Sequence, residues 1–431
     1  MLAMIPVALF LQDSLQTDLA RILEDPALAR ASVGVFVKEF AGEALFAQGP
    51  DKRLMPASAL KLVTASFALD ALGAGHPFTT SAWRDGTDVL LLGGADPMLT
   101  IEEVLDLGAR VGASRSDRVR FDDSVLGPDR VNGTWEFGDM MRADAPPVSG
   151  LTVNGGYVDL AISGGKPRLT PRNFGIAIKQ GRTSGEPDVR REHGRWTVTV
   201  HGNLPDNDPE FATVSLPDPA MCAAKLIGDK AERADLGRAP PDAVQIRKRT
   251  LADVLPAMLK RSDNHAAETV LRLAGALKGK SGSWTDSLAL ESRFLAKTGI
   301  SPSAHRLADG CGLSRFNEIT PRALVQCLEW TLSRETAAVF GSSMCMPGEG
   351  TLRNRLQGLD VRAKTGTLAG VCSLVGYIDV GPAKRRLLFA IVFNHYDGPA
   401  SGVRPIQDAI VRRLVEVTEF LPSRASHPQF R

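Results

Sequence analysis

Three short strings in this chain combine residue types that could carry out acyl transfer. They are, in chain order, Ser58-Ala59-Leu60-Lys61, Ser262-Asp263-Asn264 and Lys364-Thr365-Gly366-Thr367. A serine hydroxyl becomes a nucleophile when a neighbouring base takes its proton, and a neutral lysine amine can be that base. The second serine could relay a proton, and the second lysine could hold a carboxylate. Together the strings supply a nucleophile, a base, a relay and an anchor without a catalytic histidine.

The first string lies where a helix is expected to begin. Pro56 precedes an alanine-rich apolar run from Ala57 to Leu72, and proline is favoured in a first helical turn. Ser58 would lie at the helix N-terminus, where the dipole favours negative charge, with Lys61 one turn later. Burial or a nearby cation would lower the pKa of Lys61 and free its amine to act as a base. A surface serine-lysine pair is the alternative interpretation of this string taken alone.

The second string joins two apolar runs that are expected to be helices, Leu251 to Lys260 and Ala266 to Leu277. A loop between helices can direct short polar side chains into a cleft. Serine, aspartate and asparagine are also good N-cap residues, so a capping turn is the alternative, and both can hold at once. Asp263 is expected to be the structural member of the three.

The third string precedes two expected strands, Val371 to Ile378 and Arg386 to Phe393. Lys364, Thr365 and Thr367 would face a substrate, and Gly366 would let a substrate backbone approach the strand closely. A hairpin strand with a bulge glycine is the alternative.

Two further strings fit the same patterns in unsuitable contexts. Ser163-Gly164-Gly165-Lys166 matches the serine-lysine spacing, but its two glycines predict a hairpin turn. Lys297-Thr298-Gly299 closes an apolar-periodic run, Trp284 to Ala296, and is typical of a helix C-terminus with its capping glycine. Each pattern alone is therefore weak evidence, and the ordered triple carries the argument.

With these motifs the chain resembles the D-alanyl-D-alanine carboxypeptidase/endopeptidase family of class C low-molecular-mass penicillin-binding proteins. The resemblance spans nearly the whole chain. It includes the strings Gly94 to Leu99, Asp309 to Arg315 and Gly350 to Leu352. The family usually has serine where this chain has Cys311, which leaves the role of that position open. The resemblance implies an α+β transpeptidase-like fold, an antiparallel sheet with helices plus a helical lobe, carrying a large β-rich insertion.

The resemblance also implies a role for each motif residue. Ser58 would attack the carbonyl of the penultimate D-alanine while Lys61 takes its proton, and Ser262, close to both lysines, would relay a proton to the leaving amine. Asn264 would hold the substrate amide and orient Lys61. The backbone N–H groups of Ser58 and Thr367 would form the oxyanion hole. Substrate and carboxylate binding is assigned to Lys364, Thr365, Gly366 and Thr367. Peptidoglycan peptides ending in D-Ala-D-Ala and β-lactam antibiotics are the expected partners, and no metal or other cofactor is expected.

The long interval between the first and second motifs predicts an inserted region. We expect a DD-peptidase domain from residues 15–73 and 241–425, and one or two β-rich inserted domains over residues 74–240. The peptidase part would contain a hairpin over Ser32 to Ala47 and a last helix over Val403 to Phe420. Strands in the insertion are predicted at Asp88 to Leu92, Gly175 to Lys179 and Trp196 to His201.

Composition narrows the class of protein. The chain has 431 residues, 43 % hydrophobic residues and a net charge of +2, which argues against a nucleic-acid partner. Its five cysteines follow no framework or zinc pattern, and no disulfide is predicted. Residues 1–14 contain an apolar stretch that is either a signal-peptide core or a packed terminus. Export to the periplasm or extracytoplasmic envelope is inferred from the function, and loose membrane association and oligomeric state stay open.

Class A β-lactamases carry a deacylating glutamate after the second motif, and Thr298 to Leu307 contains no acid here. Slow release of penicillin is therefore expected, and Glu268 is interpreted as a structural hydrogen-bond partner. Three alternatives stay open: a β-lactamase or esterase on the same fold, a catalytically weak binding module, and a cell-wall scaffold.

Overall fold

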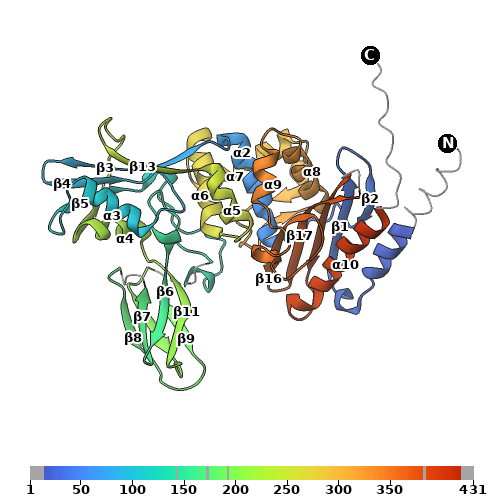
Figure 1. Cartoon of the computed structure of the whole chain (residues 1–431), viewed down its shortest axis with the longest axis horizontal. Helices are drawn as coiled ribbons and strands as arrows, with labels where there is room; N and C mark the ends of the chain where they lie inside the picture. Colours follow the sequence, from blue (N-terminus) through green and yellow to red (C-terminus); the bar gives the residue numbers. More distant parts are fainter. Residues whose placement is uncertain (1–13, 142–143, 171–173, 192–193, 382–384, 419–431) are drawn as a thin grey trace, which may run out of the picture.

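The computed structural model describes residues 14–141, 144–170, 174–191, 194–381 and 385–418. A sheet with its covering helices lies at one end, a group of helices in the middle and the inserted region at the other end (Figure 1). The predicted apolar segment 1–14 falls almost entirely outside the described residues. Within the described part of the chain, every helix is too short or too polar to cross a bilayer.

A five-stranded antiparallel sheet forms the end lobe, in the order β16-β17-β18-β1-β2. The strands are β1 (Ser32–Glu39), β2 (Ala44–Gln48), β16 (Val361–Leu368), β17 (Val371–Val380) and β18 (Arg385–Asn394). The predicted N-terminal hairpin and the two predicted C-terminal strands are therefore confirmed. Because β16 lies at the edge of the sheet, one of its sides is free to face a cleft.

Both faces of this sheet are buried. On β17, Leu374 and Ile378 pack with α10 (Ala400–Thr418) and the helix over residues 14–22, whereas Val375 and Tyr377 belong to the core of the helical lobe. This alternation follows from the two-residue period of a strand. The predicted last helix is confirmed as α10, and its predicted end at Phe420 lies outside the described residues.

The helical lobe is built around α2 (Lys61–Leu72), whose residues from Lys61 to Leu69 are all buried. The other helices of this part are α5 (Leu251–Leu259), α6 (Asn264–Lys278), α7 (Trp284–Lys297), α8 (Pro321–Leu332) and α9 (Ala337–Ser343). Such all-round burial is possible because α2 is mostly apolar, its buried polar side chains Lys61, Thr64 and Ser66 are hydrogen-bonded, and other helices and the sheet pack around it. The two helices predicted on either side of the second motif are α5 and α6.

The described residues between α2 and α5 form three sheets and two α-helices. One five-stranded sheet has the order β12-β5-β4-β3-β13, and two three-stranded sheets have the orders β11-β6-β7 and β8-β10-β9. The helices are α3 (Ile101–Arg110) and α4 (Pro219–Ile227). The strands are β3 (Pro77–Asp85), β4 (Asp88–Leu92), β5 (Arg118–Asp122), β6 (Tyr157–Ser163), β7 (Lys166–Thr170), β8 (Ala177–Gln180), β9 (Asp188–Arg191), β10 (Thr197–His201), β11 (Asn207–Ser215), β12 (Lys230–Arg233) and β13 (Val244–Thr250). One cluster of buried apolar residues runs through this region, and its division into domains stays a prediction.

The structure separates the two unsuitable strings from the motifs, as predicted. Ser163 pairs with Lys166 across a two-residue turn in which Gly164 and Gly165 both have positive φ. Lys297 ends α7, and Gly299 follows with a φ of +86°. The first string is thus a hairpin turn and the second a helix C-terminus.

Candidate active site

The first motif forms a tight turn that leads into a helix. Ala57–Leu60 is a short 3-10 helix, and α2 continues from Lys61. The α-helix therefore begins at Lys61, one turn later than predicted. Ala57 has a φ of +47°, which bends the chain directly before Ser58. The Lys61 Nζ lies 3.1 Å from the Ser58 Oγ, so the predicted nucleophile and the predicted base are within hydrogen-bonding distance.

Lys61 is fully buried, with 0 % of its surface exposed. Its Nζ donates to the Asn264 Oδ1 at 2.6 Å and to the Cys311 carbonyl oxygen at 2.7 Å, in addition to Ser58. Burial lowers the pKa of Lys61, because desolvation disfavours the ammonium form. The three oxygens fix the position of the amine, and its lowered pKa favours the neutral form that can accept a proton.

A second buried lysine contacts the second motif. The Lys364 Nζ donates to the Ser262 Oγ and to the Thr365 carbonyl oxygen, both at 2.9 Å. Burial and then the charge of Lys61 hold the pKa of Lys364 well below its usual value. Ser262 has a φ of +63°, a strained conformation for a non-glycine residue. Among the described residues no hydrogen bond joins Ser262 to Lys61, so the expected relay contact is present on the Lys364 side alone.

The remaining members of the second motif position it. Asp263 caps α6, and its Oδ1 accepts from the Ala266 N–H at 2.9 Å, which is the structural role predicted for it. The Asn264 Nδ2 donates to the Asp144 carbonyl oxygen at 2.7 Å. The inserted region therefore reaches the site through Asp144, a contact that the sequence does not indicate.

The third motif lies on the edge strand β16. The Ala363 N–H donates to the Cys345 carbonyl oxygen beyond the sheet. Because alternate residues of a strand direct their N–H groups to the same side, those of Thr365 and Thr367 also face the free edge. This is the side on which an oxyanion donor at Thr367 is required.

Gly366 has a different neighbour from the one expected. A Cβ atom at this position would lie 2.5 Å from the Pro56 carbonyl oxygen and 2.3 Å from the Ser373 Oγ. The missing side chain thus makes room for the turn before Ser58, whereas we expected it to make room for a substrate backbone. It holds the edge strand close to the nucleophile.

A cavity of about 530 Å³ connects the three motifs. Ser58, Ser262, Thr365 and Thr367 line it. Its wall also contains residues that motif spacing did not identify: Gly350, Thr351, Arg353, Asn354, Arg355 and Arg404. Arg404 comes from α10, and its Nη2 donates to the Thr367 Oγ1 at 3.4 Å. Nothing in the local sequence of α10 predicts this contact.

Two buried acids support the loop that holds Lys61. The Glu268 Oε1 accepts from the N–H groups of Gly310 and Cys311, at 2.8 and 2.7 Å, and its Oε2 accepts from the Trp284 indole. Asp309 accepts from four further donors: the N–H groups of Gly312 and Ser314, the Trp135 indole and the Asn317 amide. Burial, followed by the charge of Asp309, raises the pKa of Glu268 to about 7. The structural role predicted for Glu268 is confirmed.

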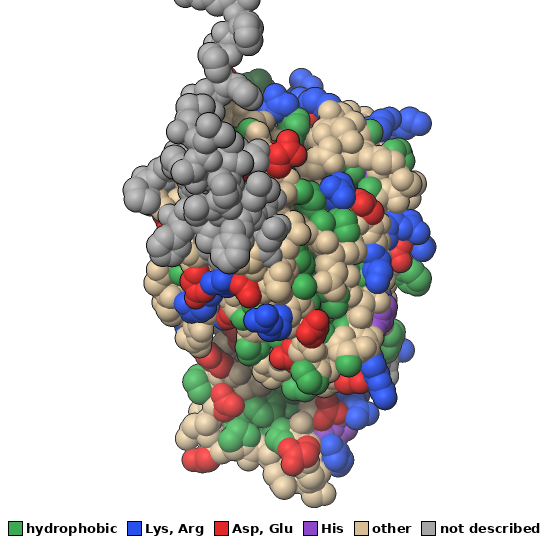
Figure 2. Space-filling view, turned by 90° about the vertical axis from the view of Figure 1, so that its right-hand side faces the viewer, with side chains coloured by type: hydrophobic (Ala, Val, Ile, Leu, Met, Phe, Trp, Pro, Cys, Tyr) green, Lys and Arg blue, Asp and Glu red, His purple; other side chains and the backbone are tan. Residues whose placement is uncertain are grey.

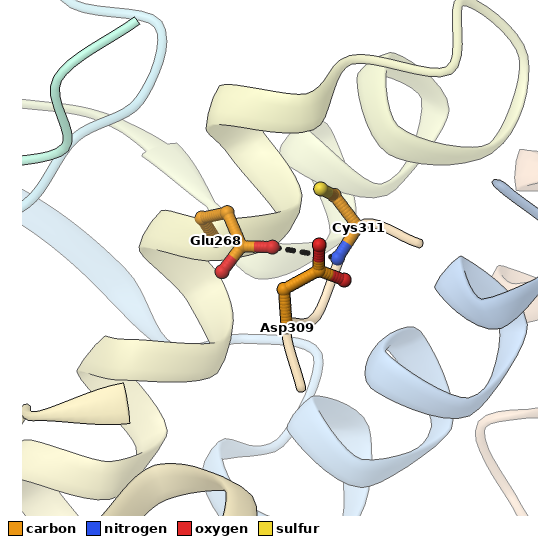
Figure 3. A group of neighbouring side chains, drawn as sticks. All are labelled: Glu268, Asp309 and Cys311. Atoms are coloured by element: carbon orange, nitrogen blue, oxygen red, sulfur yellow. Dashed lines mark hydrogen bonds between the residues drawn. The ribbon is translucent and has the colours of Figure 1, made fainter. Parts of the chain in front are cut away.

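Glu268, Asp309 and Cys311 lie together, with one potential metal-ligand atom of each within 4.8 Å of the others (Figure 3). Both carboxylates are already used as acceptors of N–H hydrogen bonds, and burial raises the pKa of the Cys311 thiol well above its ordinary value. A thiol must be deprotonated to bind a metal. The geometry therefore fits a loop support better than a metal centre.

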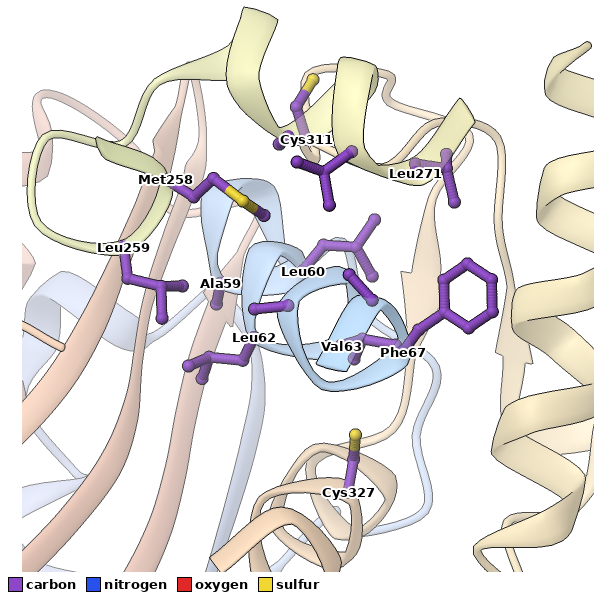
Figure 4. Packing of buried hydrophobic residues seen from close by; sticks show 14 of the residues in the cluster. Ala59, Leu60, Leu62, Val63, Phe67, Met258, Leu259, Leu271, Cys311 and Cys327 are labelled. Carbon is purple, nitrogen blue, oxygen red and sulfur yellow. The ribbon is translucent and has the colours of Figure 1, made fainter. Parts of the chain in front are cut away.

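The role of Cys311 at the site is carried by its backbone. Its carbonyl oxygen accepts from Lys61, and its N–H donates to Glu268. Its side chain belongs to the buried apolar cluster that also contains Met258 and Leu271 (Figure 4). Its thiol also makes a hydrogen bond to Glu268, so the departure from serine changes this side-chain contact and leaves the backbone contacts to Lys61 and Glu268 in place.

Comparisons with known proteins agree with this geometry. The chain is 32 % identical to a D-alanyl-D-alanine carboxypeptidase of Actinomadura sp. (strain R39), over 93 % of this chain and 84 % of the relative. It is 26 % identical to carboxypeptidase DacB of Mycolicibacterium smegmatis, over 88 % and 80 % of the two chains.

Solved structures share the fold. Penicillin-binding protein 4 of Haemophilus influenzae matches with a TM-score of 0.78 at 20 % identity, over 93 % of this chain and 99 % of that one. A predatory peptidoglycan endopeptidase of Bdellovibrio bacteriovorus matches with a TM-score of 0.55 at 15 % identity, over 92 % and 96 %. A profile of the D-Ala-D-Ala carboxypeptidase 3 (S13) family covers residues 15–417. The resemblance and this match identify the chain as a serine-type hydrolase. It belongs to the D-Ala-D-Ala carboxypeptidase 3 (S13) family.

Proposed function

We propose that this chain carries out the D-Ala-D-Ala carboxypeptidase reaction of its family through an acyl-enzyme on Ser58. The observation that carries the proposal is the fully buried Lys61 amine, 3.1 Å from the Ser58 Oγ. An exposed lysine would stay protonated at neutral pH, but desolvation favours the neutral amine that this reaction requires.

Acylation begins when Lys61 takes the proton of Ser58. The serine oxygen attacks the carbonyl carbon of the penultimate D-alanine, and the resulting oxyanion is bound by the backbone N–H groups of Ser58 and Thr367. The C–N bond then breaks, and the proton held by Lys61 passes through Ser262 to the leaving amine of the terminal D-alanine, which leaves Lys61 neutral again. The hydrogen bond from Lys364 to Ser262 supports this route. Water then attacks the ester with Lys61 again as base, which releases the shortened peptide and restores Ser58.

The terminal carboxylate is expected to bind at the end of the cavity that Thr365, Thr367 and Arg404 line. Thr365 and Thr367 offer hydroxyl groups there, with Lys364 behind them. We add Arg404 to the predicted set, because its guanidinium already contacts Thr367 and an arginine fork suits a carboxylate. Asn264 orients Lys61 in this proposal, and its amide would turn to the substrate.

Slow deacylation of β-lactams follows from the position of the acids. Glu291, in the helix before the acid-free stretch, is fully buried and accepts from the Thr64 Oγ1 at 3.0 Å. Burial raises its pKa to about 8, so it is largely protonated at neutral pH. It is therefore a poor general base, and a penicillin bound to Ser58 should stay there. An endopeptidase of Bdellovibrio bacteriovorus that shares this fold has been solved in its penicillin G-acylated form.

Intact mass measurement after incubation with benzylpenicillin tests the proposal, with the native chain beside Ser58→Ala. A stable adduct of one penicillin on the native chain, absent from the variant, supports an acyl-enzyme on Ser58. Rapid loss of penicillin without an adduct would indicate a β-lactamase. Neither adduct nor loss would contradict the acyl-enzyme and favour a binding module.

Cleavage of cross-links is the second candidate reaction, because it uses the same acyl-enzyme and differs only in the leaving amine. The endopeptidase of Bdellovibrio bacteriovorus shares this fold. Release of D-alanine from an N-acyl-D-Ala-D-Ala peptide, compared with cleavage of a purified cross-linked dimer, distinguishes the two. Since such substrates lie outside the cytoplasm, we place the protein in the extracytoplasmic envelope.

A further inference from the structure

The inserted region contributes a buried side chain to the core of the helical lobe. On the end face of the molecule seen in Figure 2, basic and acidic side chains are interspersed. Trp135, from the segment between β5 and β6, is by contrast only 5 % exposed and belongs to the same apolar cluster as the two residues between Ser58 and Lys61. Its ring packs edge-on against that of Trp284, with the ring centroids 5.9 Å apart. An aromatic ring of the insertion is thus part of the core that surrounds the first motif.

The two indoles donate to two different acids that support the same loop. The Trp135 Nε1 donates to the Asp309 Oδ2 at 3.0 Å, and the Trp284 Nε1 donates to the Glu268 Oε2 at 2.6 Å. Between them the two carboxylates accept from four backbone N–H groups of the loop, those of Gly310, Cys311, Gly312 and Ser314. Buried polar groups are held in place by such partners, and each missing partner is costly. Trp135 is therefore the contribution of the inserted region to holding this loop.

The loop in turn contacts both the predicted base and the turn that carries the predicted nucleophile. The Cys311 carbonyl oxygen accepts from the Lys61 Nζ at 2.7 Å. Gly312 has a φ of +82°, and a Cβ atom there would collide with the Ala57 carbonyl oxygen and lie 3.1 Å from the Ser58 backbone nitrogen. A shift of the loop would therefore move the acceptor of the Lys61 amine and press on the backbone of Ser58.

The segment that carries Trp135 is itself fixed beside the loop. Asn132 is buried, and its Nδ2 donates to the carbonyl oxygen of Ala308, directly before the loop, at 2.8 Å. Its Oδ1 accepts from the N–H and the hydroxyl of Thr134, at 2.9 and 2.7 Å. These bonds hold the backbone on the N-terminal side of Trp135, so its indole N–H is directed at Asp309. The inserted region thus reaches the loop through two side chains.

We propose that Trp135 is a positioning residue for acyl transfer, acting through Asp309 and the loop over residues 309–314 on the Lys61 amine. The inserted region then helps to build the catalytic site. This inference rests on the proposed function, since that function assigns Lys61 as the base.

Loss of the indole N–H leaves Asp309 with one donor fewer in a buried site, which weakens its hold on the loop. The Lys61 amine then loses its fixed acceptor and gains access to water, and hydration favours the ammonium form. Acylation should therefore require a higher pH. The titratable groups that face Lys61 are unchanged by a substitution at Trp135; they are Asp263, Glu268, Asp309, Cys311 and Lys364.

The test is Trp135→Phe in the full chain, which keeps an aromatic ring in the core and removes the N–H donor. Trp330→Phe is the matched control, because Trp330 packs edge-on against Phe294 of the same lobe, on α8. Acylation by benzylpenicillin is measured by intact mass as a function of pH. Trp135→Phe should acylate about tenfold more slowly at neutral pH, with its half-maximal rate about one pH unit higher, and Trp330→Phe should match the native chain. For a short D-Ala-D-Ala peptide, kcat should fall while KM stays within about twofold.

A native pH profile for Trp135→Phe would overturn the proposal. So would equal losses in Trp135→Phe and Trp330→Phe, because these would indicate a general loss of core packing. If denaturant unfolding shows that Trp135→Phe does not fold, Asn132→Ala loosens the same segment and should shift the profile in the same direction; an unshifted profile in that variant also overturns the proposal. No acylation of the native chain would contradict the proposed function itself, whereas native acylation with an unshifted variant contradicts the positioning role alone.

Discussion

The catalytic cleft and a second cavity, of about 520 Å³ in the inserted region, both gather cations, but in opposite environments. Lys179 and Arg190 are among the residues that line the second cavity. In the cleft, Lys61 and Lys364 are fully buried, and each amine is held by protein oxygens. In the second cavity, Lys179 and Arg190 stand on the outer face of a sheet and are exposed. Lysine is thus found in two environments that suit it to different roles.

Comparison of the two regions shows that burial decides whether a lysine is a neutral amine that can accept a proton or a charged side chain that attracts anions. Desolvation lowers the pKa of both cleft lysines, which favours the neutral amine. An exposed cation keeps its charge and attracts anions, with an energy that salt screens. A serine-lysine spacing therefore becomes catalytic only where tertiary packing removes water from the lysine.

The largest expected effect is a difference in acylation rate between variants of two strings that have the same serine-lysine spacing. Lys61→Met should slow acylation by benzylpenicillin by about 10²- to 10⁴-fold, because the base is lost. Lys166→Met, in the exposed hairpin string, should leave the rate unchanged. Stopped acylation reactions followed by intact mass measure both rates. Near-normal acylation of Lys61→Met would show that another group activates Ser58.

Burial also shifts the pKa of an acid, Glu291, and this shift makes the stability of the folded chain depend on pH. The pKa of Glu291 is raised to about 8 from 4.5, so above pH 4.5 the unfolded chain loses this proton before the folded chain does. The stabilising contribution is complete below pH 4.5 and declines as the pH rises to about 8, by up to about 1.4 kcal/mol per pH unit. Glu291→Gln should flatten this decline in denaturant unfolding between pH 5 and about 8. A native chain whose stability rises over that range would contradict the assignment.

Arg404 provides a further test of the comparison. It is a cation that lines the cleft, and it is proposed to bind the substrate carboxylate through its positive charge. Arg404→Met should reduce kcat/KM for a D-Ala-D-Ala peptide about fivefold, as expected for an ionic contact of about 1 kcal/mol. The loss should disappear with a substrate whose terminal carboxylate is amidated. Arg353→Met, which changes another cation of the same cavity wall, is the control. An equal loss on both substrates would argue against carboxylate binding by Arg404.

The smallest effect is expected at Cys311. Cys311→Ser should keep the acylation rate within about twofold, because the backbone of this residue contacts Lys61 and Glu268 and a serine hydroxyl can replace the thiol as a hydrogen-bond donor to Glu268. Placing a hydroxyl in the apolar cluster should cost less than about 2 kcal/mol of unfolding free energy. Cys327→Ser, at another buried cysteine of the same cluster, provides the comparison. A tenfold slower acylation would show that the thiol itself supports the base.

Some features were predictable because they depend on neighbours in sequence. The paired glycines at Gly164 and Gly165 specify a hairpin, and Asp263 at the start of an apolar run specifies a helix cap. The nearly continuous apolar run of β17 is typical of a strand buried on both faces. The local interpretation failed at Gly366, where the close neighbour is Pro56, several hundred residues earlier in the chain.

The sequence by itself determined the three motifs, their order and the local elements that carry them, since these depend on short-range spacing and backbone preference. Only the tertiary structure decided that Lys61 is buried, that the Cys311 carbonyl and Asn264 hold it, and that Arg404 reaches Thr367. It also decided that cations from strands β8 and β9 meet in one cavity. The burial of a side chain and the meeting of side chains at one site depend on segments that lie far apart along the chain. Local sequence patterns therefore do not predict them.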